Sequence, residues 1–187
     1  MEDFVYILDY LAVALPTATR HFKRAPSAYG IGEFEFKLLE LEPKPNVTLQ
    51  IGERVYVGKD IEKREKIARV KRRIGYENLT TTAKKELPYI LEQIVKGQEE
   101  RFITFYNESS PITTRFHSLQ LLPGLGGKTL ESVLEERNKA KFQNFEDVAK
   151  RTMLRHPDKA IVKRIELELS NPSEKYFLFV SRPKREE

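Results

Sequence analysis

The sequence contains no cysteine, which excludes disulfide bridges and thiolate metal sites. Histidine occurs three times, and the three positions stand far apart along the chain: His21, His117 and His156. No long hydrophobic run is present either, because the apolar stretch 4–15 contains Asp9 and follows acidic rather than basic residues. We therefore expect a cytoplasmic protein with no metal and no other cofactor.

Motifs that mark catalytic sites are also missing. There is no Gly-x-Ser-x-Gly and no His-Glu-x-x-His. The tripeptide 127–129 resembles the end of a P-loop, but the first glycine of that motif would fall at Leu122. Several carboxylates alternate along one segment as they would on a solvated strand, without the clustering that a metal-dependent nuclease needs: Glu33, Glu35, Glu40 and Glu42. We expect a protein that is not an enzyme.

Positive charge is present in excess and is unevenly placed. The net charge is +5, while residues 1–60 carry 7 Lys+Arg against 9 Asp+Glu. Residues 61–79 carry 7 against 3, and residues 111–187 carry 15 against 11. This asymmetry favours a polyanionic partner such as RNA or DNA, although an ordinary solvated surface would also accommodate +5.

Residues 1–78 have the alternation of short strands, which we expect at 4–11, 33–41, 47–51 and 55–57. A long loop is predicted over 16–32; it holds His21, Lys23, Arg24 and Tyr29. Residues 67–76 fit a helix or a strand, and we favour a strand because it closes a run of strands. Its outer face would then be basic, with Arg69, Lys71 and Arg73. The segment predicts an OB- or S1-like β-barrel, a common platform for single-stranded nucleic acid.

Residues 79–110 change to helical spacing and predict a helical connector. The threonines at 80–82 offer an N-cap, and a stripe of apolar residues follows: Leu87, Ile90, Leu91, Ile94 and Val95. Pro88 either marks the true start of this helix or kinks it. A second short helix is expected around 102–106.

The stretch 110–137 predicts a helix, a tight turn and a second helix. Ser110-Pro111 would open the first helix, and one face of it would carry Ile112, Phe116 and Leu119. Pro123-Gly124 ends it, and Leu125 is expected to insert between the helices. The second helix starts near Gly127, with an apolar face made of Leu130, Val133 and Leu134.

Such a turn leaves backbone amides unpaired at a helix N-terminus, which attracts anions. Lys128 in the first helical turn opposes the helix dipole unless an anion lies between them. We therefore predict a phosphate site formed by Gly124, Leu125, Gly126, Gly127, Lys128 and Thr129. The alternative is that the turn only joins two helices or docks another domain.

A second, weaker hairpin is expected after the first. Asn144 can cap a helix that begins near Phe145, and a further helix is predicted from about Pro157 to Leu169. The turn between them, 152–158, lacks glycine, so we expect it to complete the core without holding phosphate. The tail 175–180 is predicted as a last strand, and 182–187 as a charged end.

The turn Leu122–Gly126 resembles the Pro-Gly-hydrophobe-Gly turn of the helix-hairpin-helix motif. In proteins with that motif, the turn amides hold a backbone phosphate without reading sequence. More widely, the chain resembles an archaeal family of uncharacterised proteins that are predicted to bind nucleic acid. The resemblance rests on Arg72–Tyr76, Leu79-Thr80, Pro111–Arg115, Leu121–Gly126 and Phe145–Asp147. It implies an OB-like N-terminal domain and a C-terminal helix-hairpin-helix domain.

The expected fold is therefore α+β, with a small OB/S1-like barrel at 1–78, a helical connector at 79–110 and an all-helical helix-hairpin-helix domain at 111–187 that ends in a strand. The expected function is non-catalytic, sequence-independent binding of RNA or DNA. The barrel would add a second contact through Arg69, Lys71 and Arg73. The alternative is an adaptor in a larger ribosome- or repair-associated complex, in which the hairpin contacts protein.

Overall fold

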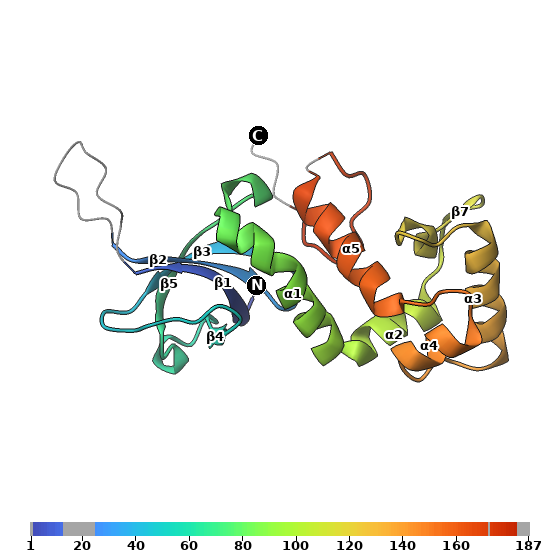
Figure 1. Cartoon of the computed structure of the whole chain (residues 1–187), viewed down its shortest axis with the longest axis horizontal. Coiled ribbons are helices and arrows are strands. Elements are labelled where there is room, and N and C mark those ends of the chain that lie inside the picture. The colour runs from blue at the N-terminus through green and yellow to red at the C-terminus, as the bar shows by residue number, and fades with distance from the viewer. Residues whose placement is uncertain (1, 13–24, 172, 183–187) are drawn as a thin grey trace. The chain divides into compact units, whose positions relative to one another are not determined.

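The fold is mixed α+β in the computed structural model, which describes residues 2–12, 25–171 and 173–182 (Figure 1). The described residues up to Ile90, together with 177–182, form one compact unit. Residues 91–176 form a second unit. In the described residues, no helix is both long enough and apolar enough to cross a membrane.

A curled, antiparallel sheet of five strands in the form of a half-barrel is the centre of the first unit (Figure 1). The strands are β1 (Phe4–Leu11), β2 (Ser27–Gly32), β3 (Leu38–Pro43), β4 (Arg54–Tyr56) and β5 (Ile67–Arg73). Their order across the sheet is β4-β1-β2-β3-β5. The predicted strand at 4–11 is confirmed. The strand predicted over 67–76 is confirmed in its choice of strand over helix, but β5 ends at Arg73.

The sheet differs from the prediction at β2, which lies inside the expected loop. Of that loop, residues 16–24 with His21, Lys23 and Arg24 lie outside the described residues. β2 has two glycines, and a Cβ on Gly30 would lie 2.3 Å from Val5 Cγ1. Close approach of β1 and β2 therefore requires glycine there, and glycine weakens the strand pattern in the sequence.

The predicted strand 33–41 is wrong in its first half, because residues 33–37 form a turn and β3 begins at Leu38. The carboxylate of Glu2 organises this turn by accepting hydrogen bonds from three backbone amides. The donors are Phe34 N at 3.1 Å, Glu35 N at 2.8 Å and Lys37 N at 3.3 Å. As a result, Phe34 is 63% exposed whereas Phe36 is buried, so the two do not share a face.

The predicted strand 47–51 is also absent. Positive φ angles at Asn46 (61°) and Gly52 (82°) turn the backbone at both ends of this segment. Leu49 is nevertheless buried with the residues of the sheet core: Val5, Ile7, Ala28, Leu39, Leu41, Val55, Val57 and Ile67. The alternation in the sequence thus identified a buried anchor, and not a strand.

Helix α1 (Thr81–Gly97) follows, then α2 (Glu99–Glu108). Thr80 caps α1 as predicted, because its Oγ1 accepts from Ala83 N at 3.0 Å and donates to Asp9 Oδ2 at 2.6 Å. Pro88 lies inside α1 and does not mark its start. The predicted apolar stripe is buried from Leu87 to Val95.

The second unit contradicts the predicted first helix of the hairpin. Residues 111–121 form a small hairpin, β6 (Pro111–Thr113) and β7 (Phe116–His117), and a 3₁₀ helix, η3 (Ser118–Leu121). Thr113 Oγ1 accepts from Arg115 N at 3.3 Å, and Ser118 Oγ donates to Ser110 O at 2.7 Å. Hydroxyl side chains that bond nearby backbone compete with the helix, which explains the error.

The rest of the second unit is helical: α3 (Gly127–Lys139), α4 (Phe145–Arg151) and α5 (Pro157–Ser170). All three starts agree with the sequence, and Asn144 caps α4 by accepting from Asp147 N at 2.8 Å. The predicted strand at 175–180 is wrong, since this segment consists of bends and irregular backbone. Residues 183–187 of the predicted charged end lie outside the described residues.

Candidate nucleic-acid interface

The turn before α3 keeps the features that predicted an anion site, although a 3₁₀ helix precedes it in place of an α-helix. Gly124 has a φ of +89°, a conformation that favours glycine. Leu125 is 6% exposed and inserts into the core as expected, next to Leu122 at 1%. Gly126 is the N-cap residue of α3.

The N-terminus of α3 has no side-chain cap. The amides of Gly127, Lys128 and Thr129 find no acceptor among the described residues, and the first intrahelical bond runs from Leu130 N to Gly126 O at 2.9 Å. A Cβ on Gly124, Gly126 or Gly127 would have no atom within 4 Å, so no other part of the described chain crowds the glycines of this turn. The arrangement can accept an anionic oxygen directly on the backbone.

The Lys128 side chain is exposed and makes no ion pair with any described residue. Its ammonium group is therefore available to a ligand at the helix N-terminus. Acidic residues are absent from the first turn of α3, in contrast to α4, where Glu146 and Asp147 occupy that turn. The electrostatics at the start of α3 thus favour an external anion over an internal one.

His117 does not belong to this site. Its Nδ1 accepts from Leu119 N at 3.1 Å, and its own backbone N donates to Gln120 Oε1 at 2.8 Å, which forms a capping box for η3. Burial, together with the charge of Arg137, lowers the pKa of the imidazole below 6.5. His117 is a structural residue, and its buried Nε2 has no hydrogen-bond partner among the described residues.

The basic face predicted on β5 is paired with acidic residues of β3. Arg69 Nε contacts Glu42 Oε2 at 2.7 Å, and Lys71 Nζ lies 3.4 Å from Glu40 Oε1. Arg72 also binds Glu40, with Nε 2.8 Å from Oε2. The strand register β3–β5 sets these pairs opposite one another.

Arg73, the third predicted cation of β5, is directed elsewhere. Its guanidinium donates to the backbone carbonyl oxygens of Ser181 and Arg182, the latter at 3.0 Å. Burial lowers the pKa of Arg73. The structure therefore brings Arg69 and Lys71 together on one exposed face, whereas Arg73 fixes the last described residues.

Three arginines of the basic C-terminal segment also have structural roles. Arg137 donates to Tyr106 O and Ser109 O at the end of α2, at 3.1 and 2.9 Å. Arg151 donates to two carbonyl oxygens at the end of α3, and the Arg164 side chain is 4% exposed and pairs with Glu168 and Glu174. Fewer cations of this segment are therefore available to a ligand than its net charge suggests.

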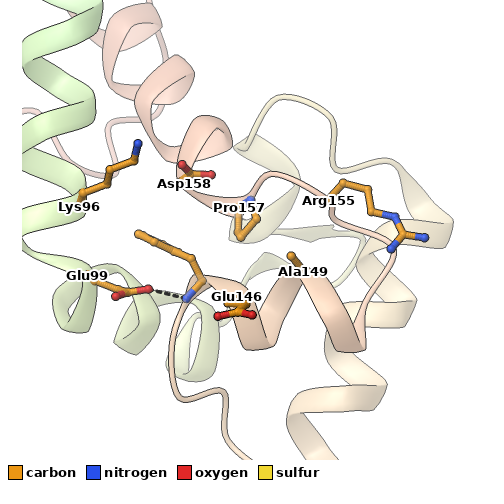
Figure 2. Close-up of a pocket in the computed structure, with 8 residues that line it drawn as sticks. Lys96, Glu99, Glu146, Ala149, Arg155, Pro157 and Asp158 are labelled. Atoms are coloured by element: carbon orange, nitrogen blue, oxygen red, sulfur yellow. Dashed lines mark hydrogen bonds between the residues drawn. The ribbon is translucent and has the colours of Figure 1, made fainter.

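A cavity of about 320 Å³ lies beside the start of α5 in the second unit (Figure 2). Two of its lining residues are joined, because Glu99 Oε1 accepts from Phe145 N at 2.6 Å. Lys96 and Arg155 are its two cations, and its three carboxylates are Glu99, Glu146 and Asp158. The excess of carboxylates makes it unsuitable for phosphate. Among the described residues, no three His, Cys, Asp or Glu side chains are grouped as metal ligands.

These features define a small α+β protein that joins a curled antiparallel half-barrel to a helical unit with a glycine-rich turn. The chain belongs to the family described as "Protein of unknown function (DUF655)", whose family model matches residues 1–181.

It is similar to the uncharacterized protein MJ0038 of Methanocaldococcus jannaschii, with 47% identity over 180 residues, which are 96% of this chain and 80% of that protein. The crystal structure of Af1531 from Archaeoglobus fulgidus, a member of the same family, has a similar fold, with a TM-score of 0.88 and 42% identity. That match covers 96% of this chain and 100% of the other. The expected membership of an archaeal family of uncharacterised proteins is therefore confirmed.

Proposed function

We propose that this protein binds RNA or DNA without catalysis, mainly through backbone phosphates, and that the turn before α3 is the principal contact. The observation that carries the proposal is the uncapped N-terminus of α3, where three amides have no acceptor among the described residues and the Lys128 side chain is exposed. Such a group binds a phosphate oxygen without reading the base. No cofactor is needed for this activity.

The half-barrel supports the same function. In an OB-fold, five strands form a partly open barrel whose loops and outer face bind oligonucleotides. The order β4-β1-β2-β3-β5 is consistent with such a barrel opened between β4 and β5. The helical unit likewise has a glycine turn followed by α3, which resembles the turn and second helix of a helix-hairpin-helix, with the 3₁₀ helix η3 in place of the first helix. We propose that Arg69 and Lys71 add weaker phosphate contacts, because Glu42 and Glu40 partly neutralise them.

The test is fluorescence-anisotropy binding to matched single- and double-stranded RNA and DNA across a salt series, with two variants of the turn. Gly126→Asp would place a carboxylate at the N-cap, where aspartate is favoured, so it would fill the anion site from within. Lys128→Glu would complement the helix dipole. Both variants should be at least as stable as the wild type, and both should lose binding by about tenfold or more if a phosphate occupies this site.

The control is Lys159→Glu, which makes the same charge change in the first turn of α5. It should leave affinity close to that of the wild type, because α5 lacks the glycine turn. For the wild type we expect log K to fall with log salt with a slope of about −2 to −5. Absence of binding to all four nucleic acids at low salt would overturn the proposal and would favour a protein partner for the turn.

A further inference from the structure

A second cavity, of about 540 Å³, lies in the half-barrel unit, along β4 and the segment that leads to β5. β4 is an edge strand of the sheet, because β1 is its only partner strand among the described residues. The cavity is lined by two aromatic rings, one aliphatic side chain, three cations and two carboxylates: Phe4, Tyr56, Val55, Arg54, Lys63, Lys66, Glu53 and Glu65. None of these residues belongs to the phosphate contacts proposed above.

The central group of the cavity is the guanidinium of Arg54. Its Cζ lies 3.4 Å from the centroid of the Phe4 ring, which is van der Waals contact with the ring face. Its edge is fixed by Glu33, with Nε 2.7 Å from Oε2 and Nη2 2.8 Å from Oε1. The side chain is still 43% exposed. Arg54 therefore presents a planar, immobilised surface that is largely neutralised by Glu33.

Phe4 is itself held in place by Tyr56. The two ring centroids are 5.3 Å apart and the planes meet at 69°, an edge-to-face pair. The three side chains thus support one another from two neighbouring strands, β1 and β4. A planar group with an aromatic support behind it is the kind of surface on which an unstacked nucleobase lies.

Cations for a sugar–phosphate backbone are found at the cavity rim. Lys63 is 72% exposed, and its ion pair with Asp60 at 3.2 Å is open to solvent, so the ammonium group can exchange partners at little cost. Lys66, by contrast, is paired with Glu53 at the cavity wall. The lining carries one more positive than negative charge, which suits a single phosphate.

We propose that this cavity accommodates one nucleotide of a single-stranded nucleic acid, with its base stacked on the Arg54–Phe4 platform and its phosphate bound by Lys63. The inference rests on the proposed nucleic-acid binding and adds to it a preference for strands whose bases are unpaired. A duplex cannot use the cavity, since its bases are stacked and paired within the helix.

The test compares two probes with the same backbone: a pyrimidine strand of about 12 nucleotides, within the site size of OB-folds, and its abasic counterpart, in both RNA and DNA series. Stacking of one base corresponds to about fivefold in affinity or more. We expect the wild type to bind the pyrimidine strand at least that much more tightly. Arg54→Lys keeps the charge but removes the plane, so it should abolish this difference while binding the abasic strand unchanged.

Lys63→Glu is an independent variant on an exposed side chain, and it should weaken binding of both probes. Arg72→Lys is the matched control, because Arg72 makes a similar contact to Glu40 on β5 but does not line the cavity. Equal affinity of the wild type for base-containing and abasic strands would overturn the inference and leave the proposed function intact. If Arg54→Lys and Arg72→Lys changed the affinity difference between the two strands equally, this would also overturn the inference and leave the proposed function intact. Absence of binding to every probe would refute the proposed function itself.

Discussion

Glu42 partly neutralises the positive charge of β5 that a polyanion could bind. It pairs with Arg69 through a single contact at 2.7 Å, and the Arg69 side chain is 69% exposed. A phosphate that binds Arg69 must compete with this carboxylate, although an exposed pair is weak and exchanges readily. Under the proposed function, Glu42 therefore limits how strongly Arg69 can bind a phosphate.

Glu42→Gln should therefore increase the affinity for nucleic acid. The change removes a negative charge from the outer face and leaves Arg69 without its anionic partner. We expect a few-fold gain at low salt and a slope of log K on log salt that is steeper by up to about one. Anisotropy titrations across a salt series measure both quantities. Glu77→Gln, at an exposed position of the same unit, is the control; an unchanged slope in Glu42→Gln would show that β5 does not contact phosphate.

Glu40 has a different role, because it is 15% exposed and binds three groups: Arg72, Ser27 and Lys71. The hydrogen bond from Arg72 is the main cause of the lowered pKa of Glu40, and those from Ser27 and Lys71 add to it. A carboxyl with a lower pKa in the folded state stabilises the protein above the unfolded-state value of 4.5, and this stabilisation is lost as pH falls through the folded-state pKa.

The Glu40→Gln variant has no titratable group at position 40. The difference in stability between the wild type and this variant should therefore depend on pH. Near neutral pH we expect the variant to be less stable by about 1 kcal/mol, the upper end for a partly exposed pair. The difference should shrink as the pH falls below 4.5. Urea unfolding over a pH series measures it. Glu100→Gln on α2 serves as the comparison, and a pH-independent difference for Glu40→Gln would contradict the role of its charge.

Among the elements, those with strong local signals were predictable from sequence. α3, α4 and α5 start where glycine, Asn144 and Pro157 indicated, because caps and first-turn residues act within a few positions of the chain. The structure of 111–121 was not predictable. The spacing of Ile112, Phe116 and Leu119 fits one face of a helix, but over too few residues to distinguish a helix from a β-hairpin. Local bonds of Thr113 and Ser118 favour the β6–β7 hairpin instead.

The residues of the candidate site also differ in whether the sequence alone could reveal them. The turn at Gly124–Lys128 could be found from sequence, since its residues are contiguous. The pairing of β5 cations with Glu40 and Glu42 could not, because it depends on the register of β3 against β5. The Arg54 platform also escaped the prediction. Phe4 and Arg54 are 50 positions apart in the sequence, and only the β1–β4 pairing brings them together.

Arg151 shows how a side chain can complete an element other than its own. Its Nη2 donates to Glu136 O at 2.6 Å and Ala140 O at 2.8 Å, and so satisfies carbonyl groups at the C-terminal end of α3. Its Nη1 also donates to Asp147 at 3.0 Å within α4. One planar guanidinium therefore joins two consecutive helices.

Arg151→Lys should destabilise the protein by about 1–3 kcal/mol, because an ammonium group cannot serve all of these acceptors and leaves a carbonyl unpaired. Chemical unfolding gives the magnitude. Lys150→Gln, at the neighbouring exposed position of α4, should cause no measurable loss. A loss of stability in Arg151→Lys no larger than that in Lys150→Gln would show that Arg151 does not satisfy the carbonyl groups at the end of α3.

For the whole molecule, the central question is whether the two compact units act on the same strand. A single helix N-terminus with one lysine contacts few phosphates, and binding of that kind is weak, with Kd of about 10⁻⁴–10⁻⁶ M. The β5 cations are partly neutralised, so the half-barrel alone is no stronger. Tight binding requires both units to engage one strand, so that the second contact forms at a high effective concentration.

This requirement predicts a steep dependence of affinity on strand length. A strand of about 4 nucleotides, the lower limit for an OB-fold, should occupy one unit only, and we expect a strand of about 30 nucleotides to engage both. We expect the longer strand to bind wild type at least 100-fold more tightly, roughly the lower end of the gain from linked sites. Lys128→Glu should remove most of this gain, because binding of the long strand then depends on the half-barrel alone. Anisotropy titrations with strands of increasing length, at one salt concentration, measure the dependence. A gradual rise in proportion to the number of nucleotides, equal in wild type and Lys128→Glu, would mean that one unit binds alone and merely meets more sites on longer strands.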